Sequence, residues 1–349
     1  MSGKISIGIL FGGKSAEHEV SLVSAENILK FINQEKYNIY KIKIDKSGQW
    51  SYNNRAVLLS QNYGDRKIIA ANNAEVIATL DVIFPVMHGP YGEDGSIQGF
   101  AKLSGLPCVG PGILASSVGM DKDVAKRLLR DSGIAIAKFI TLRKSKPNEY
   151  SYEKIIEILG NELFVKPANM GSSVGVSFAQ NKEKFEISLK EAFLYDDKVI
   201  IEEKISGREI ECAVLGNDFP KASVPGEVIP KKGFYSYDSK YIDADGAGLE
   251  IPAKLTDEII KKVQEIAIRT YQCLECKGMT RVDMFLANDN KLVINEVNTI
   301  PGFTKISMYP AMWAHSGIQY TDLIDHLINY AIEEFQNQQK LESNFIGKM

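Results

Sequence analysis

The stretch GMTRVDMFLANDNKLVINEVNTIPG, residues 278–302, contains two apolar runs separated by a short polar turn. The runs TRVDMFLA and KLVINEVN have the length and apolar content of strands, and only Asn288-Asp289-Asn290 separates them. A connection this short joins strands as an antiparallel hairpin. The second strand ends in polar side chains and then a Pro-Gly pair. The hairpin therefore predicts a sheet that carries a polar site on one face.

Four polar side chains define that face. Residues two apart in a strand point the same way, so Arg281 shares a face with Asp283, and Glu296 shares one with Asn298. Pairing Asp283 with Glu296 brings two carboxylates together, and such a pair needs a cation. Hard oxygen ligands beside a charged substrate favour Mg²⁺. The alternative, a solvated face with scattered acids, fits poorly because the intervening residues are apolar.

Composition limits the class of protein. The chain has 349 residues, 24% of them charged, with a net charge of -3 at pH 7. A nucleic-acid surface would usually show a basic excess. There is no apolar run long enough for a membrane span, and the first apolar stretch is too short for a signal peptide. The four cysteines, with Cys273 and Cys276 interpreted as helix-terminal thiols, indicate a reducing cytoplasm.

The order of predicted elements gives an α/β chain of three parts. Residues 1–120 alternate strands (4–13, 38–45, 80–89, 106–110) with helices, which predicts an open parallel sheet. Residues 48–75 are polar and are predicted to be an irregular excursion. A small central α+β domain is expected over 121–212. A C-terminal α+β domain, ending in an amphipathic helix, is expected over 213–349.

One motif match is rejected. Gly8-Ile-Leu-Phe-Gly-Gly13-Lys14-Ser15 satisfies the P-loop pattern. A P-loop opens directly after a strand, but Ile9, Leu10 and Phe11 continue the apolar strand, so the loop starts only at Gly12. A P-loop NTPase using Gly13, Lys14 and Ser15 is kept as a rival. Glu17 follows at the helix start, either to meet an ammonium group or as an acid favoured by the helix dipole.

Phosphate-binding features follow in the middle of the chain. In ELFVKPANMGSSVGVSFA a strand carrying Lys166 leads into a Gly/Ser loop, and small residues there let the backbone approach a polyphosphate. Lys122 in MDKDVAK is a second candidate cation. The strand VIIEEKI could present a backbone edge to an adenine, with an acid nearby for a ribose.

Taken in order, these motifs resemble a known family. MDKxxxKRLLRDSGI, FVKPANMGSSVGVS, VIIEEKISGREIE, GFYSYDSKY, RVDMF and INEVNTIPGFTKISMYP are similar to the ATP-grasp enzymes. Together with LFGGKSAEHEVSL and VMHGPYGEDGSIQG, they resemble the D-alanine–D-alanine ligases over residues 5–330. The resemblance implies an ATP-grasp architecture: an N-terminal open parallel α/β domain, a small central domain and a C-terminal α+β domain.

The resemblance also implies roles for particular residues. The expected ATP contacts are Lys122, Lys166, Ser172, Ser173, Glu202, Glu203, Ile205, Glu209, Phe234, Lys240, Asn295 and Glu296. Two Mg²⁺ or Mn²⁺ ions would bind Asp283, Glu296 and Asn298. Relatives often carry lysine where Glu203 stands, a departure expected to matter little because that contact is through backbone. The expected substrate and catalytic residues are Glu17, His88, Ser172, Tyr241, Arg281, Gly302, Ser307 and Met308.

The implied activity is ATP-dependent joining of two D-alanines through an acyl phosphate, with release of ADP and phosphate, for peptidoglycan synthesis in the cytoplasm. Arg281 and the backbone N–H of Gly302 would form an oxyanion pocket, and Lys240 and Tyr241 would close the site. No nucleic-acid or membrane partner is expected, and a homodimer is left open. The second rival is a non-catalytic nucleotide-binding module.

Overall fold

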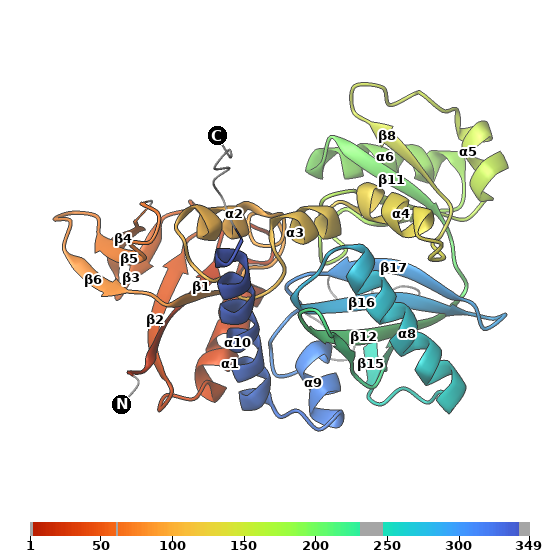
Figure 1. Ribbon diagram of the computed structural model, residues 1–349. Helices are drawn as coiled ribbons and strands as arrows, with labels where there is room; N and C mark the ends of the chain where they lie inside the picture. Colours follow the sequence, from red (N-terminus) through yellow and green to blue (C-terminus); the bar gives the residue numbers. More distant parts are fainter. Residues whose placement is uncertain (1–2, 61, 231–246, 342–349) are drawn as a thin grey trace, which may run out of the picture.

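The computed structural model describes residues 3–60, 62–230 and 247–341, and these residues form three sheets (Figure 1). The first sheet lies at the N-terminal end of the molecule. The second, smaller sheet and the third lie one above the other at the opposite end. This order matches the α/β class predicted from the sequence.

The first sheet has seven strands in the order β6-β5-β4-β3-β2-β1-β7. They are β1 (Ile5–Gly12), β2 (Tyr37–Ile44), β3 (Trp50–Tyr52), β4 (Arg55–Leu59), β5 (Lys67–Ala70), β6 (Val76–Thr79) and β7 (Val82–Pro85). Strand β1 pairs in parallel with β2 and β7, as predicted, while β3 to β6 extend the sheet as antiparallel strands. The sheet is therefore mixed, with a parallel centre.

Two expectations for this sheet are wrong. Residues 48–75 are not irregular, because they contain β3, β4 and β5. Those strands have only three to five residues, and such short pieces carry little alternating signal. Residues 106–110 are not a strand, since they contribute a single bridge between Ile83 and Cys108.

Helices flank the parallel centre of the first sheet. They are α1 (His18–Phe31) and α2 (Ser96–Leu103), whereas α3 (Ile113–Met120) contacts α2 and a strand of the third sheet. Gly8 lies in the middle of β1, and a Cβ there would stand 2.7 Å from the Leu80 side chain. The first glycine of the P-loop pattern is therefore a packing residue of a strand, as the sequence predicts.

The second sheet has four strands in the order β10-β9-β11-β8. They are β8 (Phe139–Arg143), β9 (Leu163–Pro167), β10 (Ser177–Ala179) and β11 (Lys198–Glu203). The associated helices are α4 (Lys122–Asp131), α5 (Tyr152–Leu159) and α6 (Lys182–Tyr195). Asp121 caps α4 by accepting from Val124 N–H, and Lys198 on β11 forms ion pairs with Asp121 and Asp123. These contacts fix the start of α4, where Lys122 lies.

The third sheet contains the predicted hairpin. Its strands run β15-β14-β12-β16-β17, with β13 paired to β12. They are β12 (Gly207–Gly216), β13 (Lys221–Ala222), β14 (Gly226–Pro230), β15 (Ala247–Glu250), β16 (Gly278–Ala287) and β17 (Leu292–Asn298). Helix α8 (Asp257–Cys273) packs on β12 and β16, and α9 (Met308–His315) packs on β12.

The C-terminal helix α10 (Tyr320–Gln339) contacts α1 and β7 of the first sheet (Figure 1). Residues of α10, of the segment after β17 and of β1 share one hydrophobic core, in which Phe84 and Phe303 meet edge to face at 6.1 Å. The chain therefore returns to its N-terminal part after completing the third sheet. Strand β12 (Gly207–Gly216) runs through the predicted boundary at residue 212, and the two predicted domain boundaries stay predictions.

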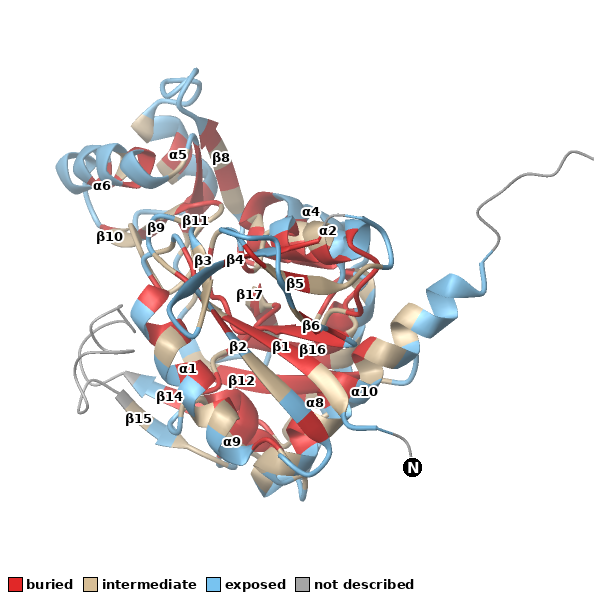
Figure 2. Ribbon diagram, turned by 90° about the vertical axis from the view of Figure 1, so that its left-hand side faces the viewer, coloured by how far each residue is buried: buried red, intermediate tan, exposed pale blue. Residues whose placement is uncertain are grey.

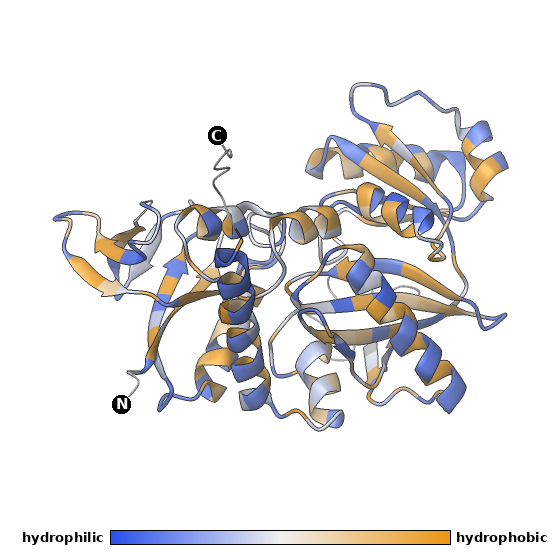
Figure 3. Ribbon diagram, in the orientation of Figure 1, coloured by the Kyte–Doolittle hydropathy of each residue, from blue (hydrophilic) through white to orange (hydrophobic). Residues whose placement is uncertain are grey.

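Many of the buried residues lie on the strands of the three sheets. Figure 2 shows buried residues concentrated on the strands, and Figure 3 shows the apolar colouring on the same elements. Cys276 is buried beyond the end of α8, and burial raises the pKa of its thiol to about 12, as expected of a structural cysteine. In the described part of the chain, no helix combines the length and apolarity needed to cross a bilayer.

Candidate active site

The hairpin has the predicted register. Arg281 on β16 lies opposite Asn298 on β17, and Asp283 lies opposite Glu296, which confirms this pairing. The register then shifts, so that Met284 pairs with Ile294 and Asn295 is left as an extra residue. A bulge of this kind re-aims a side chain. As a result the consecutive residues Asn295 and Glu296 both line the same pocket, an arrangement that regular alternation would forbid.

The neighbouring strand β12 adds a third carboxylate to this face. Glu211 lies opposite Asp283, so Glu211, Asp283 and Glu296 form a row across β12, β16 and β17. Like charges directly opposite each other destabilise a sheet unless cations intervene. Arg281 and Lys122 provide these cations, because Arg281 contacts Glu211 and Asp283, and Lys122 Nζ lies 3.6 Å from Glu296.

Arg281 is held tightly by this row. Its Nε and Nη2 donate to the two oxygens of Asp283 at 2.7 and 2.6 Å, and Nε lies 3.0 Å from Glu211 Oε2. Asn298 Nδ2 donates to Asp283 Oδ2 at 2.9 Å. Burial alone would lower the pKa of Arg281, but Asp283 and Glu211 raise it well above its usual value. Arg281 is therefore a permanent cation in the site.

A lysine cluster faces the acidic row from the second sheet and α4. Lys166 on β9 donates to Glu202 on β11 at 2.6 Å and to Asn295 at 3.2 Å. Lys126, one turn after Lys122 on α4, lies 2.9 Å from the other oxygen of Glu202 and is only 2% exposed. Burial would raise the pKa of Glu202, but Lys126 and Lys166 lower it to about 2. The Glu202 side chain is thus committed to two lysines.

The two ion pairs of Glu202 with Lys126 and Lys166, called the clamp below, lead to a prediction for stability. Glu202→Gln leaves the buried ammonium group of Lys126 and the half-buried ammonium group of Lys166 without their carboxylate, so we expect a loss of about 3–5 kcal/mol in the free energy of unfolding at pH 7. Because the folded pKa is below the ordinary value of 4.5, the stabilisation is complete above pH 4.5 and is lost as the pH falls toward 2. Urea unfolding of both proteins from pH 7 downward should show the difference shrinking.

The matched control is Glu203→Gln, at the adjacent and more exposed carboxylate. Its Oε1 accepts one backbone N–H, from Lys138, so a smaller loss is expected. Equal losses for the two variants, or a Glu202→Gln difference that does not depend on pH, would contradict the clamp.

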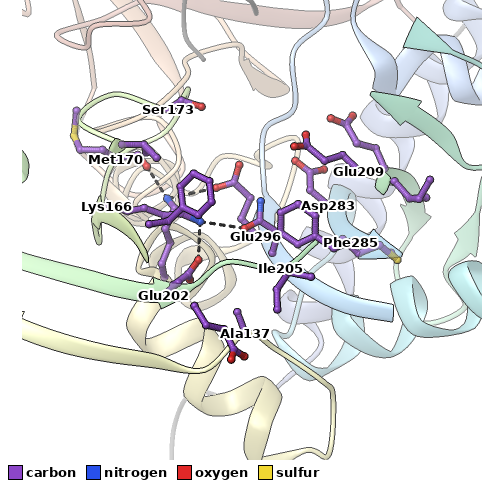
Figure 4. Close-up of a pocket in the computed structure, with 18 residues that line it drawn as sticks. Ala137, Lys166, Met170, Ser173, Glu202, Ile205, Glu209, Asp283, Phe285 and Glu296 are labelled. Carbon is purple, nitrogen blue, oxygen red and sulfur yellow. Dashed lines mark hydrogen bonds and ion pairs between the residues drawn. The ribbon is translucent and has the colours of Figure 1, made fainter. Parts of the chain in front are cut away.

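Several of these groups line a pocket between the second and third sheets (Figure 4), whereas Arg281, Asn298 and Lys126 lie behind its lining. Its empty volume is about 910 Å³, which includes open solvent. The predicted ATP and metal residues that line it are Lys122, Lys166, Ser173, Glu202, Glu203, Ile205, Glu209, Asp283, Asn295 and Glu296. Apolar side chains such as Phe164 and Phe285 complete the lining. The pocket therefore joins an apolar part, suited to a planar base, to a charged part, suited to phosphates and cations.

The charged part fits a divalent cation that shares its ligands with a phosphate. Mg²⁺ commonly uses one or two carboxylates together with substrate phosphates, and Asp283 and Glu296 supply two carboxylates side by side. Among the described residues, no group of three or more His, Cys, Asp or Glu side chains forms a ready-made metal cage. Both Asp283 oxygens already accept hydrogen bonds, so a cation there would share this carboxylate with Arg281 and Asn298.

The N-terminal residues meet at the Gly/Ser loop. The Ser172 hydroxyl donates to the carboxylate of Glu17, which is 6% exposed. A Cβ on Gly89 would stand 2.5 Å from Glu17, so glycine there lets the chain pass close to this carboxylate. Ser172 and Ser173 both have positive φ angles, 51° and 60°, a strained conformation that is common in ligand-binding loops.

His88 has partners at both ring nitrogens. Nδ1 lies 3.0 Å from Ile300 O, and Nε2 lies 3.2 Å from Ser24 Oγ. Burial lowers the pKa of the ring, so His88 is neutral near pH 7. Glu93 strengthens the same junction by accepting from the backbone N–H groups of Gly89 and Ile300. Burial and the nearby Glu17 raise the pKa of Glu93 to about 8.

The remaining predicted residues lie after β17. Ser307 precedes α9 and its Oγ lies 2.9 Å from Thr304 N. A Cβ on Gly302 would stand 2.8 Å from Ser307 Oγ, which shows how closely the two approach. Met308, the first residue of α9, is buried. Phe234, Lys240 and Tyr241 lie outside the described residues.

Sequence reasoning missed three members of the site. Lys126 lies four residues after Lys122, a helical spacing that could have revealed it. Glu211 lies two residues after Glu209, on the same strand face, and period-two reasoning could have revealed it. Glu93 lies in a Gly-rich loop, and nothing else in the local sequence indicates its role, because its partner Ile300 belongs to a distant segment.

Comparison with known proteins identifies the family. The sequence model of the D-ala D-ala ligase N-terminus matches residues 6–111, and that of the D-ala D-ala ligase C-terminus matches residues 128–329. The chain belongs to the D-alanine–D-alanine ligase family. The chain is 49% identical to the D-alanine–D-alanine ligase of Shouchella clausii, with 99% of each chain covered. It is 50% identical to D-alanine–D-alanine ligase A of Escherichia coli, over 95% of this chain and 96% of that one.

Solved structures of the family agree in fold. The D-alanine–D-alanine ligase of Coxiella burnetii superposes with a TM-score of 0.85 at 37% identity, covering 97% of this chain and 98% of that one. The VanG D-Ala:D-Ser ligase of Enterococcus faecalis gives 0.86 at 36% identity, covering 94% and 100%. These similarities confirm the family and the ATP-grasp architecture expected from the sequence motifs.

Proposed function

We propose that this chain joins two D-alanines into D-alanyl-D-alanine, with conversion of ATP to ADP and phosphate, for peptidoglycan synthesis. Family membership over nearly the whole chain supports this activity. The observation that carries it is the pocket in which Lys166 of the second sheet and Lys122 of α4 face the carboxylate row of the third sheet. Such a pocket suits phosphoryl transfer, which depends mostly on positioning and charge neutralisation.

In the proposed complex, ATP lies between the second and third sheets. Lys122 and Lys166 contact its phosphates, and the Ser172-Ser173 loop covers them. Glu203 and Ile205 present backbone to the adenine, and Glu209 holds the ribose. The apolar lining of the same pocket supports this orientation. Glu202 acts here mainly through Lys166, because two lysines already occupy its carboxylate.

Two Mg²⁺ or Mn²⁺ ions would be held by Asp283, Glu296 and Asn298. When bound, these ions neutralise charge on the phosphates during transfer. Lys122 and Arg281 balance the carboxylates in the free protein. Asn298 already donates its amide nitrogen to Asp283, which fixes the orientation of its carboxamide.

The same geometry supports the amino-acid chemistry. A carboxylate does not react with an amine at neutral pH, so ATP activates the first D-alanine as an acyl phosphate, which the second D-alanine attacks. Arg281 and the backbone N–H of Gly302 stabilise the oxyanion. Glu17 pairs with the first ammonium group. A direct contact between His88 and the first carboxylate would replace its bond to Ser24. Ser307 and Met308 hold the second carboxylate.

The decisive experiment measures phosphate release with ATP and Mg²⁺ in the presence of different amino acids. D-alanine alone is expected to drive turnover, and L-alanine is expected to leave only background release. D-serine and D-lactate, each added with D-alanine, test the second substrate, because one structural relative is named a D-Ala:D-Ser ligase. Equal release with and without D-alanine would contradict the proposal and favour a plain nucleotide hydrolase.

A further inference from the structure

The carboxylate row contains one member without an assigned role. Glu211 comes from β12, whereas the proposed metal ligands lie on β16 and β17. It is 6% exposed and lies directly opposite Asp283. Its Oε2 is 3.0 Å from Arg281 Nε, the same nitrogen that donates to Asp283 Oδ1 at 2.7 Å. Arg281 is therefore shared between two carboxylates on neighbouring strands.

This sharing matters because Asp283 has competing partners. In the described structure its two oxygens accept two bonds from Arg281 and one from Asn298. A carboxylate offers only about four acceptor positions, so three are already taken and a metal ion competes with Arg281 and Asn298 for Asp283. A guanidinium and a metal ion also repel each other across one carboxylate. Arg281 therefore needs a second anchor if it is to give up Asp283 and still face the reacting carbonyl.

We propose that Glu211 is this anchor: it is a positioning residue that retains Arg281 in the site when Asp283 binds the metal. Without the Glu211 contact, Arg281 depends on Asp283 alone and competes with the metal for it. The inference rests on the proposed metal role of Asp283 and Glu296, and it assigns no direct contact between Glu211 and substrate.

The test measures Mn²⁺ binding in the presence of ADP, so that no turnover occurs. Electron paramagnetic resonance reports free Mn²⁺ and gives a dissociation constant for each variant. Glu211→Gln removes the charge and so the ion pair with Arg281. Glu211→Asp keeps the charge but withdraws it from Arg281 by one methylene. Both are expected to raise the Mn²⁺ dissociation constant about tenfold, equivalent to about 1.4 kcal/mol.

The matched control is Glu227→Gln. Glu227 lies on β14 of the same sheet, is buried, and is held by a two-bonded fork from Arg208, but it does not line the pocket. Its loss is expected to leave the Mn²⁺ constant within twofold of the unmodified protein. Thermal unfolding and ADP binding of every variant show whether the fold and the nucleotide site persist.

Arg281→Met separates positioning from direct metal ligation. Without the guanidinium there is no competitor for Asp283, so adding Glu211→Asp to Arg281→Met is expected to have no further effect on Mn²⁺ binding. A further loss in this double variant would show Glu211 to be a ligand and overturn the proposal. A Glu211→Asp protein that binds Mn²⁺ like the unmodified protein would also overturn it. Failure of the unmodified protein to bind Mn²⁺ with ADP would instead remove the metal site itself.

Discussion

Glu296→Ala is expected to abolish turnover, with phosphate release reduced by about 10³-fold or more. Glu296 is one of the two adjacent carboxylates proposed to hold the metal ions, and it also lies 3.6 Å from Lys122 Nζ. Its removal takes away charge stabilisation worth several kcal/mol in the transition state, and each 1.36 kcal/mol is a factor of ten in rate. Phosphate release at saturating ATP, Mg²⁺ and D-alanine measures the effect.

The control for Glu296→Ala is Asp289→Ala in the turn of the same hairpin. Asp289 is exposed and its side chain accepts from the local Lys291 N–H, so its loss should leave the rate nearly unchanged. Urea unfolding checks that the Glu296→Ala protein is folded. Near-normal phosphate release from the folded variant would refute the metal assignment of Glu296.

Lys166→Met is expected to produce the second large effect, a loss of about 10²-fold or more in kcat/KM for ATP. Lys166 lies in the charged part of the pocket, where Glu202 and Asn295 hold its ammonium group. Removing it deletes the proposed phosphate contact and also leaves Glu202 with Lys126 as its remaining cation in the cluster. Calorimetry measures the loss of nucleotide binding, and steady-state kinetics with varied ATP measure the loss in kcat/KM.

Lys14→Met is the matched lysine control, and it tests the P-loop rival. Lys14 lies outside the pocket, with its ammonium group 5.9 Å from the ring centre of Tyr91. Its removal is expected to change kcat/KM for ATP by about fivefold or less, because the contact with Tyr91 is worth at most about 1 kcal/mol and 1.36 kcal/mol corresponds to a factor of ten in rate. If Lys14→Met destroyed ATP binding while Lys166→Met spared it, the assignment of the nucleotide site would have to be reversed.

The sequence by itself determined the elements that are long, strongly patterned or locally connected. The hairpin of β16 and β17 was predicted with its pairing of Asp283 and Glu296, because a three-residue turn fixes the register of the strands beside it. The placement of Gly8 inside β1 followed equally from an uninterrupted apolar run. The family motifs then gave roles to residues whose local pattern was ambiguous, such as Glu17 and His88.

Only the tertiary structure decided how these pieces meet. Glu211 joins the acidic row because β12 pairs with β16, a contact between strands more than 60 residues apart in the sequence. Lys126 on α4 reaches Glu202 on β11, and Glu93 joins Gly89 to Ile300, through contacts between segments that lie far apart in the sequence. The bulge at Asn295 breaks the period of two on which strand reasoning depends. These contacts depend on how distant segments pack together. The local pattern of one sequence gives no information on the charge or shape of a distant partner.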